Sequence, residues 1–244
     1  MGFSEFLLLQ FLAHVLADYF LQTDALALDK NTKGFKSKFL VWHALIVFTL
    51  AWLLSFQLHF FIGAGVIAIT HYLIDGFKVK LNTHSVLGPH AFFIDQTMHL
   101  LIIVGVAMLY DRFHGLDFYY ELPISYNALL ILSAYLLCLK PANIFIKEVF
   151  RSSKIAIAMT NKEATHDVSR ATELPNAGKV IGILERLLAL TFIMIGEYQA
   201  VGFLIAAKSI LRYKDTDTLK TEYVLIGTML SFGIAVGLGI YIGL

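Results

Sequence analysis

Six runs of predominantly apolar residues, each close to the length that a helix needs to cross a bilayer, divide this sequence. A helix crosses a hydrocarbon core about 30 Å thick with about 20 residues, and charged side chains are costly inside that core. Only 15% of the residues are charged, whereas an ordinary soluble domain has roughly 25%. The sequence therefore predicts an all-α, polytopic transmembrane helical bundle of about six spans. The predicted spans are 3–21, 39–54, 60–74, 91–110, 126–145 and 223–244.

A further apolar stretch at 180–207 is interrupted by Glu185, Arg186 and Glu197. Its two halves of about ten residues are each too short to cross a bilayer alone. This favours a re-entrant helical hairpin that turns near Gly196 and Glu197. The alternative is one continuous helix that buries Glu197.

The lysines and arginines lie on alternate connections between the predicted spans. Because positively charged loops are retained in the cytoplasm, segments 24–38, 76–90 and 140–179 are predicted inside and the N-terminus outside. The polar segment 148–178 is predicted to be a cytoplasmic loop. Since no internal repeat separates the parts, we expect one membrane-embedded domain over 1–244. Within it, a four-helix region at 1–110 is followed by C-terminal helices at 180–244.

Charge and cysteine content narrow the possible functions. A net charge of +1 provides no general basic field, so nucleic-acid binding is excluded as the main function. The single cysteine, Cys138, excludes an internal disulfide and any multi-cysteine metal site. The ligands of a bound metal would then have to be histidine, aspartate or glutamate.

Histidines and aspartates recur inside the predicted spans at a spacing of four residues, which places both side chains of a pair on one helix face. The order is His then Asp in the first and third spans and is reversed in the fourth. Because the fourth span runs in the opposite direction, all three pairs are predicted at one depth, near the cytoplasmic face. The candidate ligands, with one more histidine from the second span, are His14, Asp18, His43, His71, Asp75, Asp95 and His99.

We interpret this layer as a divalent-metal site, because ionisable groups inside a membrane mark sites or ion paths. Histidine with carboxylate suits Zn, Mn or Fe, and seven ligands exceed what one tetrahedral zinc needs. Two ions about 3.5–4 Å apart would use them better. Gln22 and Gln96 are candidate hydrogen-bonding partners of the ligands. A hydrogen-bonded proton relay and a purely structural polar layer are the alternatives.

A second group of charged residues lies near the C-terminus. Arg186, Lys208 and Arg212 are candidate ligands for an anion such as a phosphate. Alternatively, Arg186 neutralises Glu185 and Lys208 extends to the membrane interface.

Several motifs resemble a known family. The segments HVLADYFLQTD (14–24), HYLID (71–75) and DQTMH (95–99) are similar to those of the bacterial membrane family called domain of unknown function 3307, as are three segments within 177–232 (AGKVIGILERLL, GFLIAAKSILR and EYVLIGTMLSF). The resemblance implies a multi-pass protein of the bacterial inner membrane, without an assigned activity. A looser similarity links the membrane-embedded His and Asp residues to inner-membrane metal-dependent hydrolases. Their His-Arg-Gly motif has no counterpart here, and His84 with Ser85 matches their His-Ser pair only in part.

Three functions are compatible with these residues. The first is a metal-dependent hydrolase of a membrane lipid or other phosphoester, in which Asp18, Asp75 or Asp95 acts as general base if it does not bind metal. The second is a transporter or sensor of divalent metal ions, and the third is a membrane protein whose polar layer only fixes helix packing. A transporter site is expected near the bilayer midplane. The off-centre depth of the layer therefore favours chemistry or sensing.

Overall fold

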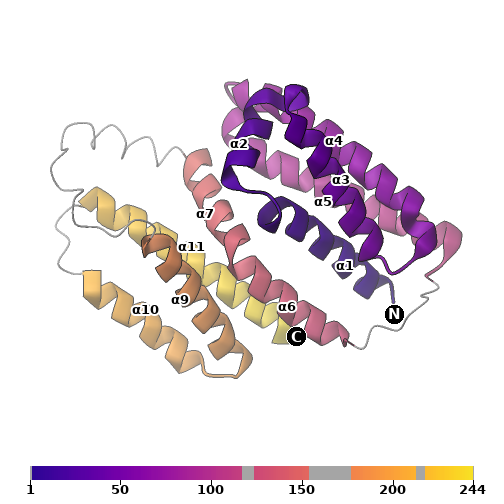
Figure 1. Cartoon of the computed structure of the whole chain (residues 1–244). Helices are drawn as coiled ribbons and strands as arrows, with labels where there is room; N and C mark the ends of the chain where they lie inside the picture. Colours follow the sequence, from indigo (N-terminus) through magenta and orange to yellow (C-terminus); the bar gives the residue numbers. More distant parts are fainter. Residues whose placement is uncertain (1, 117–123, 154–176, 213–217, 244) are drawn as a thin grey trace. The chain divides into compact units, whose positions relative to one another are not determined.

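A computed structural model describes residues 2–116, 124–153, 177–212 and 218–243. Within these residues every regular element is a helix and there is no strand (Figure 1), so the predicted all-α fold class is confirmed. The chain divides into two compact units, residues 1–129 and 130–244. Each unit is described by itself below, and the single domain over 1–244 stays a prediction.

The N-terminal unit consists of five helices joined by short turns. Its main helices are α1 (Phe3–Val15), α2 (Asp24–Lys33), α3 (Lys38–Leu53), α4 (Phe61–Thr83) and α5 (Ala91–His114). Helix α4 packs along both α3 and α5, while α1 contacts α3 and α5, and α2 lies against α4 and α3. Helix α1 continues directly into a π-helical turn, Leu16–Phe20. These contacts enclose a common interior between α1, α3, α4 and α5.

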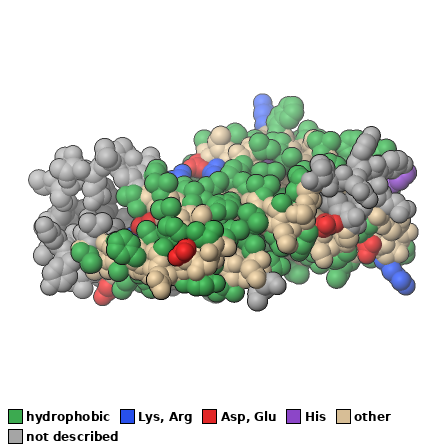
Figure 2. All heavy atoms as spheres, turned by 90° about the horizontal axis from the view of Figure 1, so that it is seen from below, with side chains coloured by type: hydrophobic (Ala, Val, Ile, Leu, Met, Phe, Trp, Pro, Cys, Tyr) green, Lys and Arg blue, Asp and Glu red, His purple; other side chains and the backbone are tan. Residues whose placement is uncertain are grey.

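Several helices are long and apolar enough to cross a membrane. Four segments qualify alone: Phe3–Phe20, Leu58–Thr83, Gly88–His114 and Thr221–Gly243. Two bent pairs qualify together, namely Asp24–Lys36 with Lys38–Leu53 and Tyr126–Cys138 with Lys140–Ser152. The positions of the six predicted spans correspond to these four segments and two pairs. Many large hydrophobic side chains are exposed, and the face seen in Figure 2 is mostly hydrophobic with few charges, as expected for a membrane protein.

The structure corrects two boundaries in the N-terminal unit. The basic segment 24–38, expected as a connection, contains α2, which is bent by 106° from α3. The third span was expected to end at residue 74, but α4 continues to Thr83. The fall in hydropathy after residue 74 therefore marks the point where the helix becomes more polar, and it does not mark the end of the helix. As a result, Lys78 lies on α4 close to Asp75.

An aromatic cluster fills one end of the N-terminal unit. The ring of Phe6 lies 5.0 Å from that of Phe60 and 6.0 Å from that of Tyr110, and the rings of Phe60 and Tyr110 are 4.9 Å apart. The hydroxyl of Tyr110 donates a hydrogen bond of 2.6 Å to Oε1 of Gln57. All four side chains are buried. The cluster therefore closes this end of the bundle with tightly packed apolar surface.

Helices α2 and α4 come unusually close where α2 ends. Gly34 follows α2 with a φ of +52°, and a Cβ atom there would lie 2.8 Å from the carbonyl oxygen of Gly76 on α4. Only glycine combines this backbone conformation with so close an approach. The two glycines thus allow α2 to pack against α4.

We expect Gly34→Ala to destabilise the protein by about 1–3 kcal/mol, because alanine adds backbone strain and a clash. The midpoint of thermal unfolding in detergent measures this effect. Gly65→Ala is the matched control, since its Cβ would lie in open space on α4 and alanine favours the helix. Equal stability of Gly34→Ala and the wild type would contradict the close packing of α2 on α4.

The C-terminal unit also consists of helices, of which α11 packs along α9. Its elements are α6 (Tyr126–Cys138), α7 (Lys140–Ser152), α9 (Ala177–Met194), α10 (Tyr198–Arg212) and α11 (Thr218–Gly243). Helices α9 and α10 pack on one another and are separated by a turn in which Gly196 has a φ of +80°. The stretch 180–207 is thus a helical hairpin, and the alternative of one continuous helix is wrong. The predicted loop 148–178 begins within α7, and its residues 154–176 lie outside the described residues.

Candidate metal centre

All seven residues predicted as ligands meet in the interior of the N-terminal unit. They come from α1 and its π-helical turn, α3, α4 and α5, and no side chain among them is more than 8% exposed. They form three overlapping groups in which the potential ligand atoms lie within 4.8 Å of one another. These groups are His14, Asp18 and His71; His43, His71 and Asp75; and Asp75, Asp95 and His99. The pairing of His and Asp four residues apart does bring these side chains together.

Five of the six separations among four potential ligand atoms in the middle of the cluster are close to those of a tetrahedral metal site; we call these atoms the tetrahedral set. The Nε2 atoms of His43 and His71 are 3.0 Å apart and lie 3.1 and 3.2 Å from Oδ1 of Asp18. Oδ2 of Asp75 is 3.6 Å from the first nitrogen and 3.4 Å from the second. Four ligands at zinc-like distances of about 2.0–2.1 Å from a metal would be roughly 3.3–3.4 Å apart in tetrahedral geometry. The arrangement thus matches the donor spacing of a small divalent ion.

A second group contains polar atoms without hydrogen-bond partners. Oδ1 of Asp75, Oδ1 of Asp95 and Nε2 of His99 are buried, and none of them forms a hydrogen bond. The histidine nitrogen lies 3.7 Å from the Asp75 oxygen and 3.5 Å from the Asp95 oxygen. Buried polar atoms without partners are costly. A cation between these three atoms would satisfy all of them.

The π-helical turn positions Asp18 and Tyr19 next to Gln96 of α5. Gln96 donates a hydrogen bond to Oδ2 of Asp18, and its Oε1 accepts one from the hydroxyl of Tyr19. Oε1 of Gln96 also lies 3.2 Å from Nε2 of His14, and its amide donates to Oδ2 of Asp95. Gln96 therefore has the contacts expected of a residue that orients ligands. π-Helical turns inside α-helices are frequent at functional sites.

Two lysines belong to the cluster and were missed by the sequence analysis. Nζ of Lys30, on α2, lies 2.6 Å from Oδ2 of Asp75, and this lysine is 3% exposed. Nζ of Lys78 lies 2.7 Å from Oδ2 of Asp95. In the sequence, both lysines indicate only the cytoplasmic side of the predicted topology. The sequence does contain one signal for Lys78. It follows Asp75 by three residues, so the two side chains are neighbours on one helix face if the helix continues past residue 74.

The lysines change the charge balance of the site. They compensate two of the three carboxylates, so one negative charge remains in this set when the four imidazoles are neutral. A buried charge without compensation is strongly unfavourable. The lysines bind the Oδ2 atoms of Asp75 and Asp95, whereas the Oδ1 atoms of both carboxylates face His99. The balance therefore favours an additional positive charge on the side of the Oδ1 atoms.

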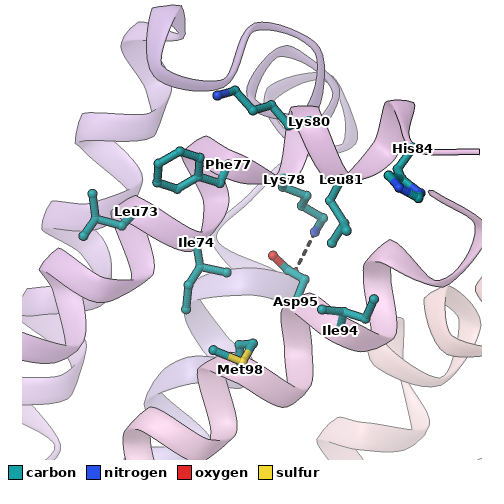
Figure 3. A pocket seen from close by; sticks show the side chains of 10 residues that line it. All are labelled: Leu73, Ile74, Phe77, Lys78, Lys80, Leu81, His84, Ile94, Asp95 and Met98. Atoms are coloured by element: carbon teal, nitrogen blue, oxygen red, sulfur yellow. Dashed lines mark hydrogen bonds and ion pairs between the residues drawn. The ribbon is translucent and has the colours of Figure 1, made fainter. Parts of the chain in front are cut away.

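A pocket of about 470 Å³ lies between α4 and α5 beside the Lys78–Asp95 pair. Figure 3 shows Lys78 reaching from α4 to Asp95 on α5, with the apolar side chains of Ile74, Leu81 and Ile94 around them. The pocket is mainly apolar, but it contains these two charged groups of the cluster. It therefore borders the candidate metal centre.

The candidate anion ligands of the C-terminal unit have other partners. Arg186 is fully buried, and its guanidinium donates hydrogen bonds to the carbonyl of Cys138, to Oγ of Ser231 and to Oδ1 of Asn143. Lys208 forms an ion pair with Glu185. The side chain of Arg212 lies outside the described residues. The arginine thus joins α9 to the end of α6, to α7 and to α11, and anion binding stays a prediction.

Comparison with protein families supports the resemblance in the first half of the chain. Residues 6–121 match the family described as "Protein of unknown function (DUF3307)". This segment, slightly less than half of the chain, is thus similar to the DUF3307 family. All seven candidate ligands, both lysines and Gln96 lie within the DUF3307 segment, whereas the C-terminal motifs in 177–232 lie outside it. No curated protein and no solved structure matches the chain. The comparisons thus add no support for the looser similarity to hydrolases.

Proposed function

We propose that the DUF3307 segment is a membrane-embedded, metal-dependent hydrolase of a lipid or other phosphoester. The observation that carries the proposal is the spacing of 3.0–3.6 Å between the histidine nitrogens of His43 and His71 and the oxygens of Asp18 and Asp75. Imidazole and carboxylate together suit Zn, Mn or Fe. The unpartnered oxygens of Asp75 and Asp95 and the nitrogen of His99 provide donors for a second ion.

A network of hydrogen bonds alone accounts less well for the centre of the cluster. The two Nε2 atoms of His43 and His71 lie 3.0 Å apart and both face one oxygen of Asp18. A single proton fits between the two nitrogens, so both imidazoles cannot carry a proton there without crowding. A metal ion instead takes up deprotonated nitrogens. The short nitrogen–nitrogen distance therefore favours metal over the proton relay.

The residues around the proposed metal divide into distinct roles. A bound divalent metal lowers the pKa of a coordinated water to about 7 and stabilises charge on a leaving oxygen. If only the tetrahedral set holds a metal ion, Asp95 is not a ligand. Its Oδ1 atom is then free and the residue borders the pocket, so we assign it the role of general base in this one-ion form. Lys78 and Lys30 hold the Oδ2 atoms of Asp95 and Asp75, and Gln96 orients Asp18 and His14.

The other end of the bundle argues against a transport path. Beyond His14 on α1, Gln10 is buried and donates a hydrogen bond to the carbonyl of Ala51. One turn further, Phe6 packs in the aromatic cluster with Phe60 and Tyr110. A transporter needs access to its site from both faces. The closed packing at this end favours access from one side and hence hydrolysis.

The proposal predicts that Asp95→Asn lowers the rate of hydrolysis about 10²- to 10⁴-fold, because general-base catalysis contributes on that order. Purified full-length protein is loaded with zinc or manganese and incubated with vesicles of phosphatidylglycerol, and release of the headgroup phosphate is measured. Asp111→Asn, which changes an exposed acid on the same helix, is the matched control and is expected to keep the wild-type rate. Metal content is measured on every sample.

Three outcomes would contradict the proposal. The first is well-folded wild-type protein that binds no divalent metal, and the second is hydrolysis that is unchanged in Asp95→Asn. The third is uptake of the metal into sealed vesicles without any hydrolysis, which would favour the transporter.

A further inference from the structure

The pocket between α4 and α5 combines two kinds of surface. Leu73, Phe77 and Met98 line it and are themselves about half exposed. The pocket therefore opens on the outer surface of two helices that are long and apolar enough to span a membrane. In a bilayer this side of α4 and α5 faces hydrocarbon chains rather than water.

Basic side chains lie at one end of the same pocket. Lys80 and His84, near the end of α4, are exposed and are both lining residues. Figure 3 shows His84 beyond Leu81, while Lys80 turns back so that its ammonium group lies over the ring of Phe77, 5.6 Å from the ring centroid. Lysine at a helix end is positioned to meet a phosphate at the membrane interface. Apolar and basic side chains thus follow one another along α4 in the order of an acyl chain and an anionic headgroup.

We propose that an anionic phospholipid binds in this pocket, with an acyl segment against Ile74 and Met98 and its phosphate beside Lys80 and His84. The volume of about 470 Å³ is within the range of roughly 300–1,000 Å³ that is typical of small-molecule sites. The charge complementarity selects an anionic over a zwitterionic lipid. Lipid binding itself is independent of the proposed function; only the role of this lipid as the substrate rests on that function. As the substrate, the lipid would reach the proposed metal centre past the Lys78–Asp95 pair.

Lipid retention tests the proposal in purified full-length protein. Native mass spectrometry counts bound phosphatidylglycerol or phosphatidylcholine in wild type and in Met98→Trp, which fills the pocket. We expect Met98→Trp to bind phosphatidylglycerol about tenfold more weakly, which corresponds to the loss of about two buried methylene groups. Leu101→Trp is the matched control, because Leu101 is exposed on the same helix and does not line the pocket.

Lys80→Glu is expected to remove the preference for phosphatidylglycerol over phosphatidylcholine. Lys36→Glu, at an exposed position outside the pocket, is expected to leave this preference unchanged.

Equal binding of phosphatidylglycerol by wild type and Met98→Trp would overturn the proposal, and so would displacement of the lipid by glycerol phosphate at equal concentration. Metal content is measured on the same samples. Loss of lipid with the metal retained supports the pocket as the lipid site. Protein without metal whose lipid binding still depends on Met98 and Lys80 supports the pocket and rejects the metal-dependent hydrolase. The failures of the two proposals are therefore distinguishable.

Discussion

Replacing His71 with alanine is expected to lower the affinity for a divalent metal more than about 100-fold, since the loss of an outer hydrogen-bonding partner alone costs roughly 10- to 100-fold. His71 contributes to two of the three groups of potential ligands. Its ring also stacks on that of His99, with centroids 3.8 Å apart. Its removal therefore affects both the tetrahedral set and the neighbouring group. Titration of metal-free protein with zinc, followed by isothermal calorimetry, measures the change.

His84→Ala is the control for this experiment, because His84 is exposed at the end of the same helix. It is expected to keep the wild-type affinity. His71→Ala that is folded and binds zinc with unchanged affinity would show that the histidines form a structural or proton-conducting layer. Circular dichroism and the elution volume in detergent establish whether the variant is folded.

Replacing Lys30 with methionine is expected to destabilise the metal-free protein by about 3–5 kcal/mol, because Asp75 loses its buried cationic partner. Nζ of Lys30 lies 2.6 Å from Oδ2 of Asp75, and both side chains are almost completely buried. The same change frees an oxygen of the tetrahedral set. Added zinc is therefore expected to recover more stability in Lys30→Met than in the wild type. Thermal unfolding with and without zinc measures both effects.

Two further variants make this result specific. Lys36→Met removes an exposed lysine and is expected to change stability by less than about 0.5 kcal/mol. The Lys30→Met, Asp75→Asn double variant removes both charges of this pair, so the total loss is expected to be smaller than the sum of the single losses. Additive losses would mean that the two side chains do not stabilise each other.

The candidate ligands were predictable from the sequence because their signal is local. His and Asp four residues apart share a helix face whatever the tertiary structure. The reversed order in 95–99 compensates for the reversed direction of α5. The convergence of these residues follows from helix geometry and topology together. The π-helical turn at Leu16–Phe20 was not predictable in this way. Its backbone hydrogen bonds join residues five apart instead of four, and this difference does not change the hydrophobic pattern.

The two lysines were missed because charge at the end of an apolar run has two readings. A lysine there indicates the cytoplasmic side if its side chain is solvated. It forms a buried ion pair instead if a helix packs over it. Lys30 became buried because the close contact of Gly34 and Gly76 lets α2 pack on α4. That contact joins residues 42 positions apart in the sequence. Periodicity within one segment carries no information about it.

The aromatic cluster of Phe6, Phe60 and Tyr110 has a consequence for how the site responds to the energised membrane. A charge gains about 2.3 kcal/mol per 100 mV only when it crosses the voltage drop. If the proposed metal ion reaches the His/Asp site only from the end opposite to these aromatic rings, it does not pass this apolar layer. Its occupancy would then follow the ion concentration of one compartment, and the membrane potential would neither drive nor oppose its binding.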